Sequence, residues 1–176
     1  SRILEIDKLV QSEMSTKTFP TNSFEAPLAG SLIPWIDVKL DNGQSREEWK
    51  AFAETNKILG NEDKPIPIDG TCVRIGSMRS HSAALTIKLR KNISKNEIEN
   101  IIKETSEWTQ VVKNEKISTI KELSPASVSG TLKVPVGRIR KLNIGQHYLN
   151  VFTIGDQLLW GAAEPLRRML KIVLHH

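Results

Sequence analysis

The sequence has few of the residues that build disulfides and nucleic-acid surfaces. Cys72 is the one cysteine among 176 residues, so no disulfide can form within the chain, and this usage fits a reducing compartment. Aromatic residues make up only 5%, and the one dense basic stretch, GRIRK at 137–141, has none interleaved for base stacking. The net charge of +5 therefore favours a solvated surface or a small phosphate-bearing ligand over a nucleic acid.

Long apolar runs and several common functional signatures are also missing. No window approaches the ~20 apolar residues that span a bilayer, and the start shows no basic stretch followed by an apolar one, so we expect no membrane partner and no secretory signal. The sequence contains no G-x-G-x-x-G, P-loop or G-x-S-x-G motif. Its histidines and cysteine lack metal-ligand spacing, so no metal site is predicted.

Apolar periodicity and capping signals predict four helices. Residues 3–14 and 156–174 carry an apolar stripe at helical spacing, and Pro165 should disturb the second of these helices. Ser45 with Glu48 forms a capping box for a helix that Gly60 ends. Ser94 with Glu97 begins another helix, with its isoleucines expected to be buried: Ile98, Ile101 and Ile102. The proline-rich segment 19–37, which contains Pro20, Pro27 and Pro34, should be irregular.

Alternating apolar residues predict strands at 71–77, 83–90, 109–113, 129–142 and 147–155. The strands and helices are intermixed without a regular strand–helix–strand alternation. The predicted fold class is therefore α+β, a mixed and mostly antiparallel sheet with helices packed on it, ending in a long helix.

One short stretch, CVRIGSMRSHS at 72–82, suggests a binding site. Arg74 lies inside an apolar strand-like run, where a cation is costly unless an anion meets it, and His81 follows in a short polar loop. A structural carboxylate could equally neutralise Arg74, and a loop histidine is commonly only a surface residue. On the helix at 45–60, Glu47 and Lys50 share one side, although a salt-bridged exposed face explains them as simply.

Four long strings resemble bacterial aspartate-β-semialdehyde dehydrogenase, most closely the gamma-proteobacterial form. They are PLAGSLIPWIDVKLDNGQSREEWKAFAETNKIL, CVRIGSMRSHS, GTLKVPVGRIRKLNIG and FTIGDQLLWGAAEPLRRML. The resemblance implies that residues 1–155 form part of a substrate-binding and dimerisation domain like that of the glyceraldehyde-3-phosphate dehydrogenase-like family. It also implies that helix 156–174 packs on an NADP-binding domain outside this chain. We set aside residues 175–176 as a tag remnant.

The resemblance further implies a reaction. In lysine, threonine, methionine and diaminopimelate biosynthesis, the family reduces β-aspartyl phosphate with NADPH to aspartate semialdehyde and phosphate. A cysteine thiolate forms a thioester with the substrate, and this chemistry needs a proton shuttle and charged groups that fix the substrate. The expected assembly is a cytoplasmic homodimer.

Residues of this sequence match the family's functional positions one by one. Arg74 matches the arginine that binds the substrate α-carboxylate, and His81 matches the general acid/base. Glu47 and Lys50 match the groups that meet the substrate amino group and the phosphate, respectively. Gln157 matches a glutamine near the nicotinamide end of the cofactor, although it could simply belong to the first turn of the last helix.

Cys72 is not expected to be the nucleophile. The family nucleophile belongs to a different motif, upstream of everything in this chain, and a cysteine within a strand usually packs as a small apolar group. The chain alone should therefore be inactive. Two other interpretations stay open: a truncated, non-catalytic paralogue that dimerises or binds an anionic ligand, and a basic nucleic-acid binder.

Overall fold

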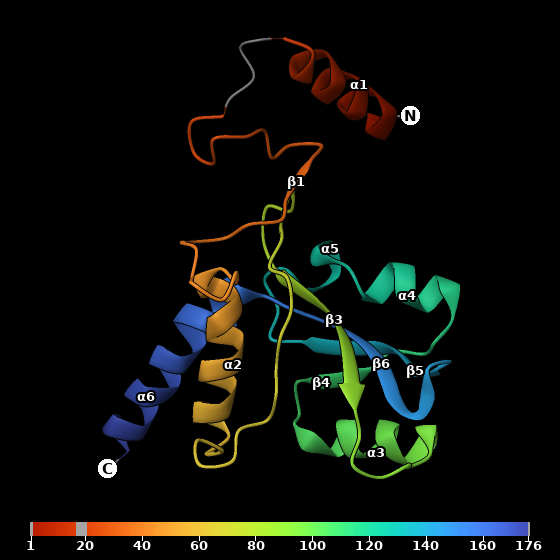
Figure 1. Ribbon diagram of the computed structural model, residues 1–176. Helices are drawn as coiled ribbons and strands as arrows, with labels where there is room; N and C mark the ends of the chain where they lie inside the picture. The colour runs from red at the N-terminus through yellow and green to blue at the C-terminus, as the bar shows by residue number, and fades with distance from the viewer. Residues whose placement is uncertain (1, 17–20, 176) are drawn as a thin grey trace. The chain divides into compact units, whose positions relative to one another are not determined.

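The computed structural model describes residues 2–16 and 21–175, which form two compact units, Ser1–Gly76 and Ser77–His176. Figure 1 shows the elements of each unit. Among the described residues, no helix has both the length and the apolar content that crossing a membrane requires. The predicted class is confirmed, because helices accompany a sheet in an α+β arrangement that ends in a helix.

The described part of unit 1 contains two helices and one small pair of strands. They are α1 (Arg2–Met14), β1 (Leu32–Ile33), α2 (Arg46–Ile58) and β2 (Arg74–Ile75). β1 pairs with β2 in antiparallel register, Leu32 opposite Ile75. The strand predicted at 71–77 is therefore too long, because the observed strand spans Arg74–Ile75. Pro34 explains this, because it follows β1 directly and has no N–H to continue the ladder.

The long segment before α2 is largely irregular, as its prolines indicate, although Pro20 lies outside the described residues. α2 begins with the predicted capping box. The Ser45 Oγ accepts the Glu48 N–H at 3.4 Å, and the Glu48 carboxylate accepts the Ser45 N–H at 2.8 Å. The helix ends before Gly60, whose φ of 65° is accessible to glycine at little cost.

Unit 2 is built on a four-stranded sheet with the order β3-β6-β5-β4. Its strands are β3 (His81–Lys88), β4 (Thr109–Val111), β5 (Val134–Leu142) and β6 (Gly145–Gly155). All neighbours are antiparallel except β4 and β5, so the predicted mixed sheet is confirmed. His81 opposes Gly155 as the first residue of β3 and does not lie in a loop, because the β6 backbone extends far enough to pair with it.

Three helices cover the two faces of this sheet: α3 (Lys95–Thr105), α4 (Lys116–Glu122) and α5 (Pro125–Val128) (Figure 1). On one face Leu149 and Val151 pack with Ile139 and Ile98 of α3. Side chains alternate along β6, so Ile154 faces the opposite side, where it packs with the other apolar cluster: Val112, Leu123 and Val128. Ile101 was predicted to be buried but is 53% exposed, because it faces away from the sheet.

One predicted strand of unit 2 starts later than expected, and the predicted disturbance at Pro165 is confirmed. Residues 129–133, expected to begin a strand, instead follow α5 through a turn at Gly130 with φ of 80°. The last predicted helix is divided into a π-helical segment η1 (Leu159–Ala163) and α6 (Glu164–Leu174). Pro165 accounts for the division, because its ring cannot follow a regular α-helical turn.

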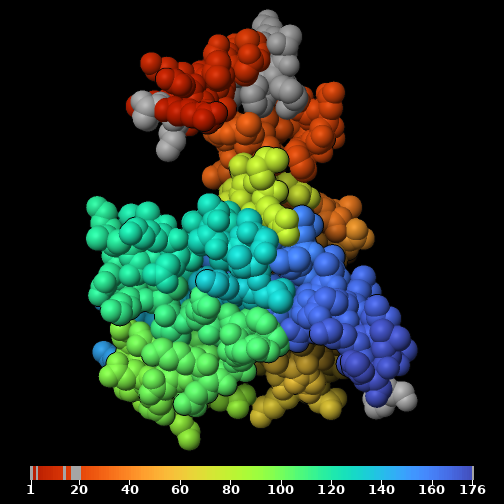
Figure 2. Space-filling model, turned by 180° about the vertical axis from the view of Figure 1, so that it is seen from behind, coloured from red at the N-terminus to blue at the C-terminus, as the bar shows by residue number. Residues whose placement is uncertain are grey.

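The C-terminal segment is held to residues just before β4 and β5 by an aromatic and ionic cluster. Trp160 donates from Nε1 to the Leu132 carbonyl at 3.3 Å and meets Trp108 edge-on at 5.2 Å. The Arg168 guanidinium lies 4.0 Å from the Trp108 ring centroid and binds the buried Glu164 carboxylate at 2.8 Å. The apolar stripe of α6 nevertheless stays exposed within its unit, and Figure 2 shows this blue helix at the surface.

Candidate functional site

Arg74, the predicted carboxylate ligand, lies in β2 with an exposed side chain. Its guanidinium carbon is 5.0 Å from the centre of the Phe24 ring. No described residue forms an ion pair or side-chain hydrogen bond with this guanidinium. The alternative of a structural carboxylate partner therefore has no support among the described residues, and the planar donor fork is available to an external anion.

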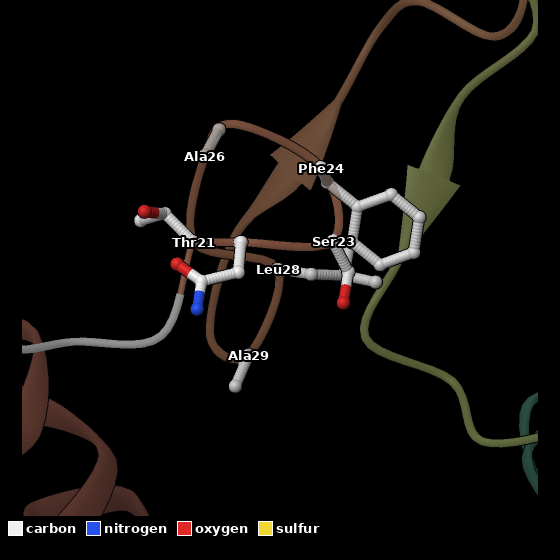
Figure 3. Close-up of a pocket in the computed structure, with 7 residues that line it drawn as sticks. Thr21, Ser23, Phe24, Ala26, Leu28 and Ala29 are labelled. Atoms are coloured by element: carbon white, nitrogen blue, oxygen red, sulfur yellow. The ribbon is translucent and has the colours of Figure 1, made fainter.

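Phe24 also lines a hollow of about 400 Å³ (Figure 3). One stretch of chain forms it, the lining residues being Thr21, Asn22, Ser23, Phe24, Ala26, Leu28 and Ala29. None of these carries an ionisable group. The hollow is therefore not itself a catalytic centre, and its link to the candidate site is the face of Phe24 on which Arg74 rests.

Glu47 and Lys50 lie one turn apart on α2. The Lys50 Nζ donates to the Glu47 carboxylate at 3.2 Å, and about 40% of each side chain is exposed. Such a pair is worth little in water, because solvent competes for both charges. A ligand can therefore replace this pair: an anionic group would bind the Lys50 ammonium, and a cationic group would bind the Glu47 carboxylate.

Glu48, between them in sequence, connects α2 to the segment just before β2. One of its carboxylate oxygens caps the helix at Ser45, and the other accepts the Cys72 N–H at 3.0 Å. These backbone donors lower the pKa of Glu48, with the Ser45 N–H as the largest cause. Only the capping role was predicted; the spacing S-x-x-E could not reveal a partner 24 residues away.

Cys72 has the opposite chemistry to an activated nucleophile. Burial raises the pKa of its thiol, and the negative charges of Glu48 and Glu47 raise it further. A thiol in this setting stays protonated near neutral pH. Although Cys72 precedes β2 and was expected inside a strand, its surroundings fit the predicted non-catalytic role.

His81, the predicted proton shuttle, begins β3 of unit 2 and is exposed. Its imidazole forms no hydrogen bond or ion pair with any residue that the structure describes. The backbone before it is strongly constrained. Ser80 is buried and has φ of 83°, a conformation that non-glycine residues rarely adopt.

Gln157 lies beside this strained residue, just after the end of β6. Its Oε1 accepts the Ser80 N–H at 2.6 Å. Because the amide oxygen is used in this way, the amide nitrogen is the group left to meet a ligand. Both earlier interpretations of Gln157 are therefore compatible with this geometry: it belongs to the first turn of the terminal segment, and its amide nitrogen has no partner among the described residues.

Asp156, preceding Gln157, is fully buried and is the first residue of the predicted helix 156–174. Its carboxylate accepts the Leu158 N–H at 3.0 Å, as a cap would, and the Gly130 N–H at 2.6 Å. It also forms an ion pair of 2.7 Å with the Nε of Arg79. The Arg79 guanidinium is the largest cause that holds the pKa of Asp156 at about 2. Sequence spacing gave no signal for this pair, which joins residues 77 positions apart.

The candidate residues thus fall into two groups. Arg74, Glu47 and Lys50 belong to unit 1, whereas His81 and Gln157 belong to unit 2. Among the described residues, no cluster of three or more histidine, cysteine, aspartate or glutamate side chains is arranged to hold a metal ion.

Comparison with known proteins places this arrangement in a family. The sequence model of the family described as "Semialdehyde dehydrogenase, dimerisation domain" matches residues 2–160. The structure of aspartate semialdehyde dehydrogenase from Francisella tularensis is similar with a TM-score of 0.87 and 46% identity. That match covers 97% of this chain and 47% of the Francisella chain, so the chain spans less than half of that protein's length.

Aspartate semialdehyde dehydrogenase II from Vibrio cholerae is similar at lower identity. Its structure matches with a TM-score of 0.78 and 25% identity, over 89% of this chain and 44% of that one. A structure of the Vibrio enzyme complexed with ASA matches with the same values. On the extent of the family match and the identity to the Francisella protein, the chain belongs to the semialdehyde dehydrogenase dimerisation-domain family.

Proposed function

We propose that this chain is the substrate-binding and dimerisation part of an NADP-dependent, phosphorylating aspartate-semialdehyde dehydrogenase of amino-acid biosynthesis in the cytoplasm. The observation that carries the proposal is the 46% identity to the Francisella enzyme over 97% of the chain. The exposed Arg74 guanidinium, which has no ion-pair partner among the described residues, gives this similarity a chemical basis, because it is ready to receive an amino-acid carboxylate.

In this proposal the charged residues of unit 1 fix the substrate. Arg74 donates two parallel hydrogen bonds to the α-carboxylate, Glu47 accepts from the α-ammonium group, and Lys50 binds the phosphate. The 3.2 Å Lys50–Glu47 pair supports this assignment, since each charge is held in place before the substrate replaces its partner.

His81 moves the proton. Its neutral imidazole takes the proton of a cysteine thiol that lies outside this chain, and the imidazolium later returns one to the reacting oxygen. Exposure at the start of β3 supports this role, because no described residue occupies either ring nitrogen.

Gln157 is this chain's contribution to the cofactor site. Its oxygen is held by Ser80, so its Nε2 is oriented to donate to the carboxamide of a nicotinamide ring. Bound NADPH supplies the hydride, and its phosphates would be held outside this chain, which has no glycine-rich phosphate loop. The family's dimerisation domain supports a homodimer as the working assembly.

The test is the kinetics of Arg74→Ala in the complete protein that contains this chain. Hydrogen bonds to charged groups contribute about 1.5–3 kcal/mol, so kcat/KM for aspartate semialdehyde should fall about 10- to 150-fold. Arg46→Ala is the matched control, because Arg46 is an exposed arginine of the same unit that pairs with Asp37. Unchanged kinetics in Arg74→Ala would remove Arg74 from the site.

His81→Gln tests the second half of the proposal. Loss of a general acid/base should lower kcat by about 10²–10⁴-fold and leave KM nearly unchanged. A normal kcat in this variant would refute the proton-shuttle role.

A further inference from the structure

The residues before His81 are bound to the residues after β6 by two adjacent contacts. Arg79 forms its ion pair with Asp156, and the Ser80 N–H donates to Gln157. The register explains why they meet. His81 opposes Gly155 at the end of the antiparallel ladder, so the residues just before His81 and those just after Gly155 leave the sheet next to each other.

The strained Ser80 is held by a third contact. Its Oγ lies 3.0 Å from the Oγ of Ser129, and Ser129 already donates its hydroxyl proton to the Pro125 carbonyl at 2.7 Å. Ser80 must therefore be the donor of this bond. A positive φ in a residue with a side chain persists only where such surroundings enforce it, and strain of this kind is concentrated at functional sites.

Asp156 is the centre of this arrangement. Its buried carboxylate joins three segments: the turn before β3 through Arg79, the turn after α5 through Gly130, and the start of the terminal helical segment through Leu158. The His81 imidazole has no described partner of its own. Its position is therefore set by the backbone on each side, and on the N-terminal side by this junction.

We propose that Asp156 is a positioning residue for His81: through its ion pair with Arg79 it holds the strained turn at residues 79–80 from which the imidazole extends. This inference rests on the proposed function, since it assigns a partner to the proton shuttle. It gives Arg79 a role and explains why a carboxylate is fully buried at the end of β6.

The experiment compares Asp156→Asn with Glu164→Gln in the complete protein. Glu164 is the matched control, because it is also buried, also bound by arginine and also has a pKa held at about 2, but it lies on α6. Asp156→Asn should lower kcat about 10- to 100-fold with KM changed less than about threefold, as expected when a shuttle is displaced. Glu164→Gln should lower the melting temperature and keep kcat.

Arg79 variants make the test independent of the folding of Asp156→Asn. Arg79 is partly exposed, and its replacement leaves the bonds from Gly130 and Leu158 to Asp156 in place. Arg79→Met should lower kcat as Asp156→Asn does, whereas Arg79→Lys, which keeps the charge, should recover part of the loss. Amide hydrogen exchange at Ser80 should become faster in Arg79→Met.

Three outcomes are decisive. If Asp156→Asn and Glu164→Gln lower kcat equally at equal loss of melting temperature, Asp156 is only structural and the inference is overturned. If His81→Gln is impaired but Arg79→Met is not, the inference fails and the proposed function stands. If His81→Gln itself keeps a normal kcat, the proposed function fails.

Discussion

The two units of this chain keep different kinds of residue away from water. In Ser1–Gly76 the buried side chains that the structure describes are polar: Ser45, Glu48 and Asn56. In the described part of Ser77–His176 eight Ile, Leu and Val side chains are buried, in clusters on both faces of the sheet. The first unit is thus shaped by side chains that hydrogen-bond to the backbone, and the second by an apolar core.

This difference matches the roles that we propose for them. The charged residues that would meet the substrate lie on the unit whose geometry depends on directional hydrogen bonds. The proposed proton shuttle begins a strand of the unit with the apolar core. Among the described residues of unit 2, the buried polar side chains are Ser80, Asp156 and Glu164. Ser80 directly precedes His81, and Asp156 directly follows Gly155, the residue opposite His81 in the sheet.

Removing apolar volume from unit 2 should have the largest effect. Ile139 is 1% exposed and packs between Ile98 and the β6 residues of its cluster. Ile139→Ala should lower the free energy of unfolding by about 2–5 kcal/mol, because a cavity replaces the lost methyl groups. Urea denaturation measures this change.

Ile144→Ala is the control for that experiment. Ile144 lies in the same unit but is 70% exposed, so its truncation should change the free energy of unfolding by no more than about 0.5 kcal/mol. Equal effects of the two substitutions would show that the apolar clusters do not distinguish unit 2.

The sequence predicted these apolar features well, because periodicity is a local signal. Residues within one turn or one strand are enough to predict the helix starts at Ser45 and Ser94, the largely antiparallel sheet and the disturbance at Pro165. α4 and α5 were not predicted. Each spans at most seven residues, too few for a periodic pattern to be recognised.

The site was harder to predict, because its organisation depends on distant pairs. The resemblance suggested Arg74 and His81 as site residues, but neither spacing nor composition could pair Glu48 with Cys72 or Asp156 with Arg79. Such contacts depend on which strand ends meet. Ser80 illustrates the limit, since nothing in its local sequence indicates a positive φ.

Removing a polar anchor from unit 1 should have a smaller effect than the loss of Ile139. Asn56 is 3% exposed, donates to the Phe52 and Ile66 carbonyls and accepts the Ile66 N–H at 2.7 Å. Asn56→Ala should lower the free energy of unfolding by about 1–2 kcal/mol, because water reaches Ile66 and replaces part of the lost hydrogen bonding. Amide exchange at Ile66 should become faster.

Asn42→Ala provides the comparison for Asn56, since Asn42 is exposed and its side chain, among the described residues, bonds to nearby Gln44 alone. It should leave exchange at Ile66 unchanged. If Asn56→Ala also leaves it unchanged, side-chain hydrogen bonds do not hold this unit together.

The Arg46–Asp37 ion pair at the surface of unit 1 should contribute less than Ile139 or Asn56. Arg46 binds Asp37 at 2.6 and 2.9 Å, but the Arg46 side chain is 54% exposed, so solvent weakens the pair. Arg46→Ala should lower the melting temperature by no more than about 4 °C at pH 7. Arg46 is the largest cause that lowers the pKa of Asp37 from its ordinary 3.8.

This lowered pKa sets the pH at which the difference in melting temperature between the unsubstituted protein and Arg46→Ala disappears. The stabilisation is present above pH 3.8 and is lost as the pH falls through the lower pKa of the folded state, where Asp37 is protonated. Melting curves of the two proteins should therefore converge in acid, and also in high salt, which screens the exposed charges. A difference that persists under both conditions would mean that Arg46 stabilises the unit by packing rather than by charge.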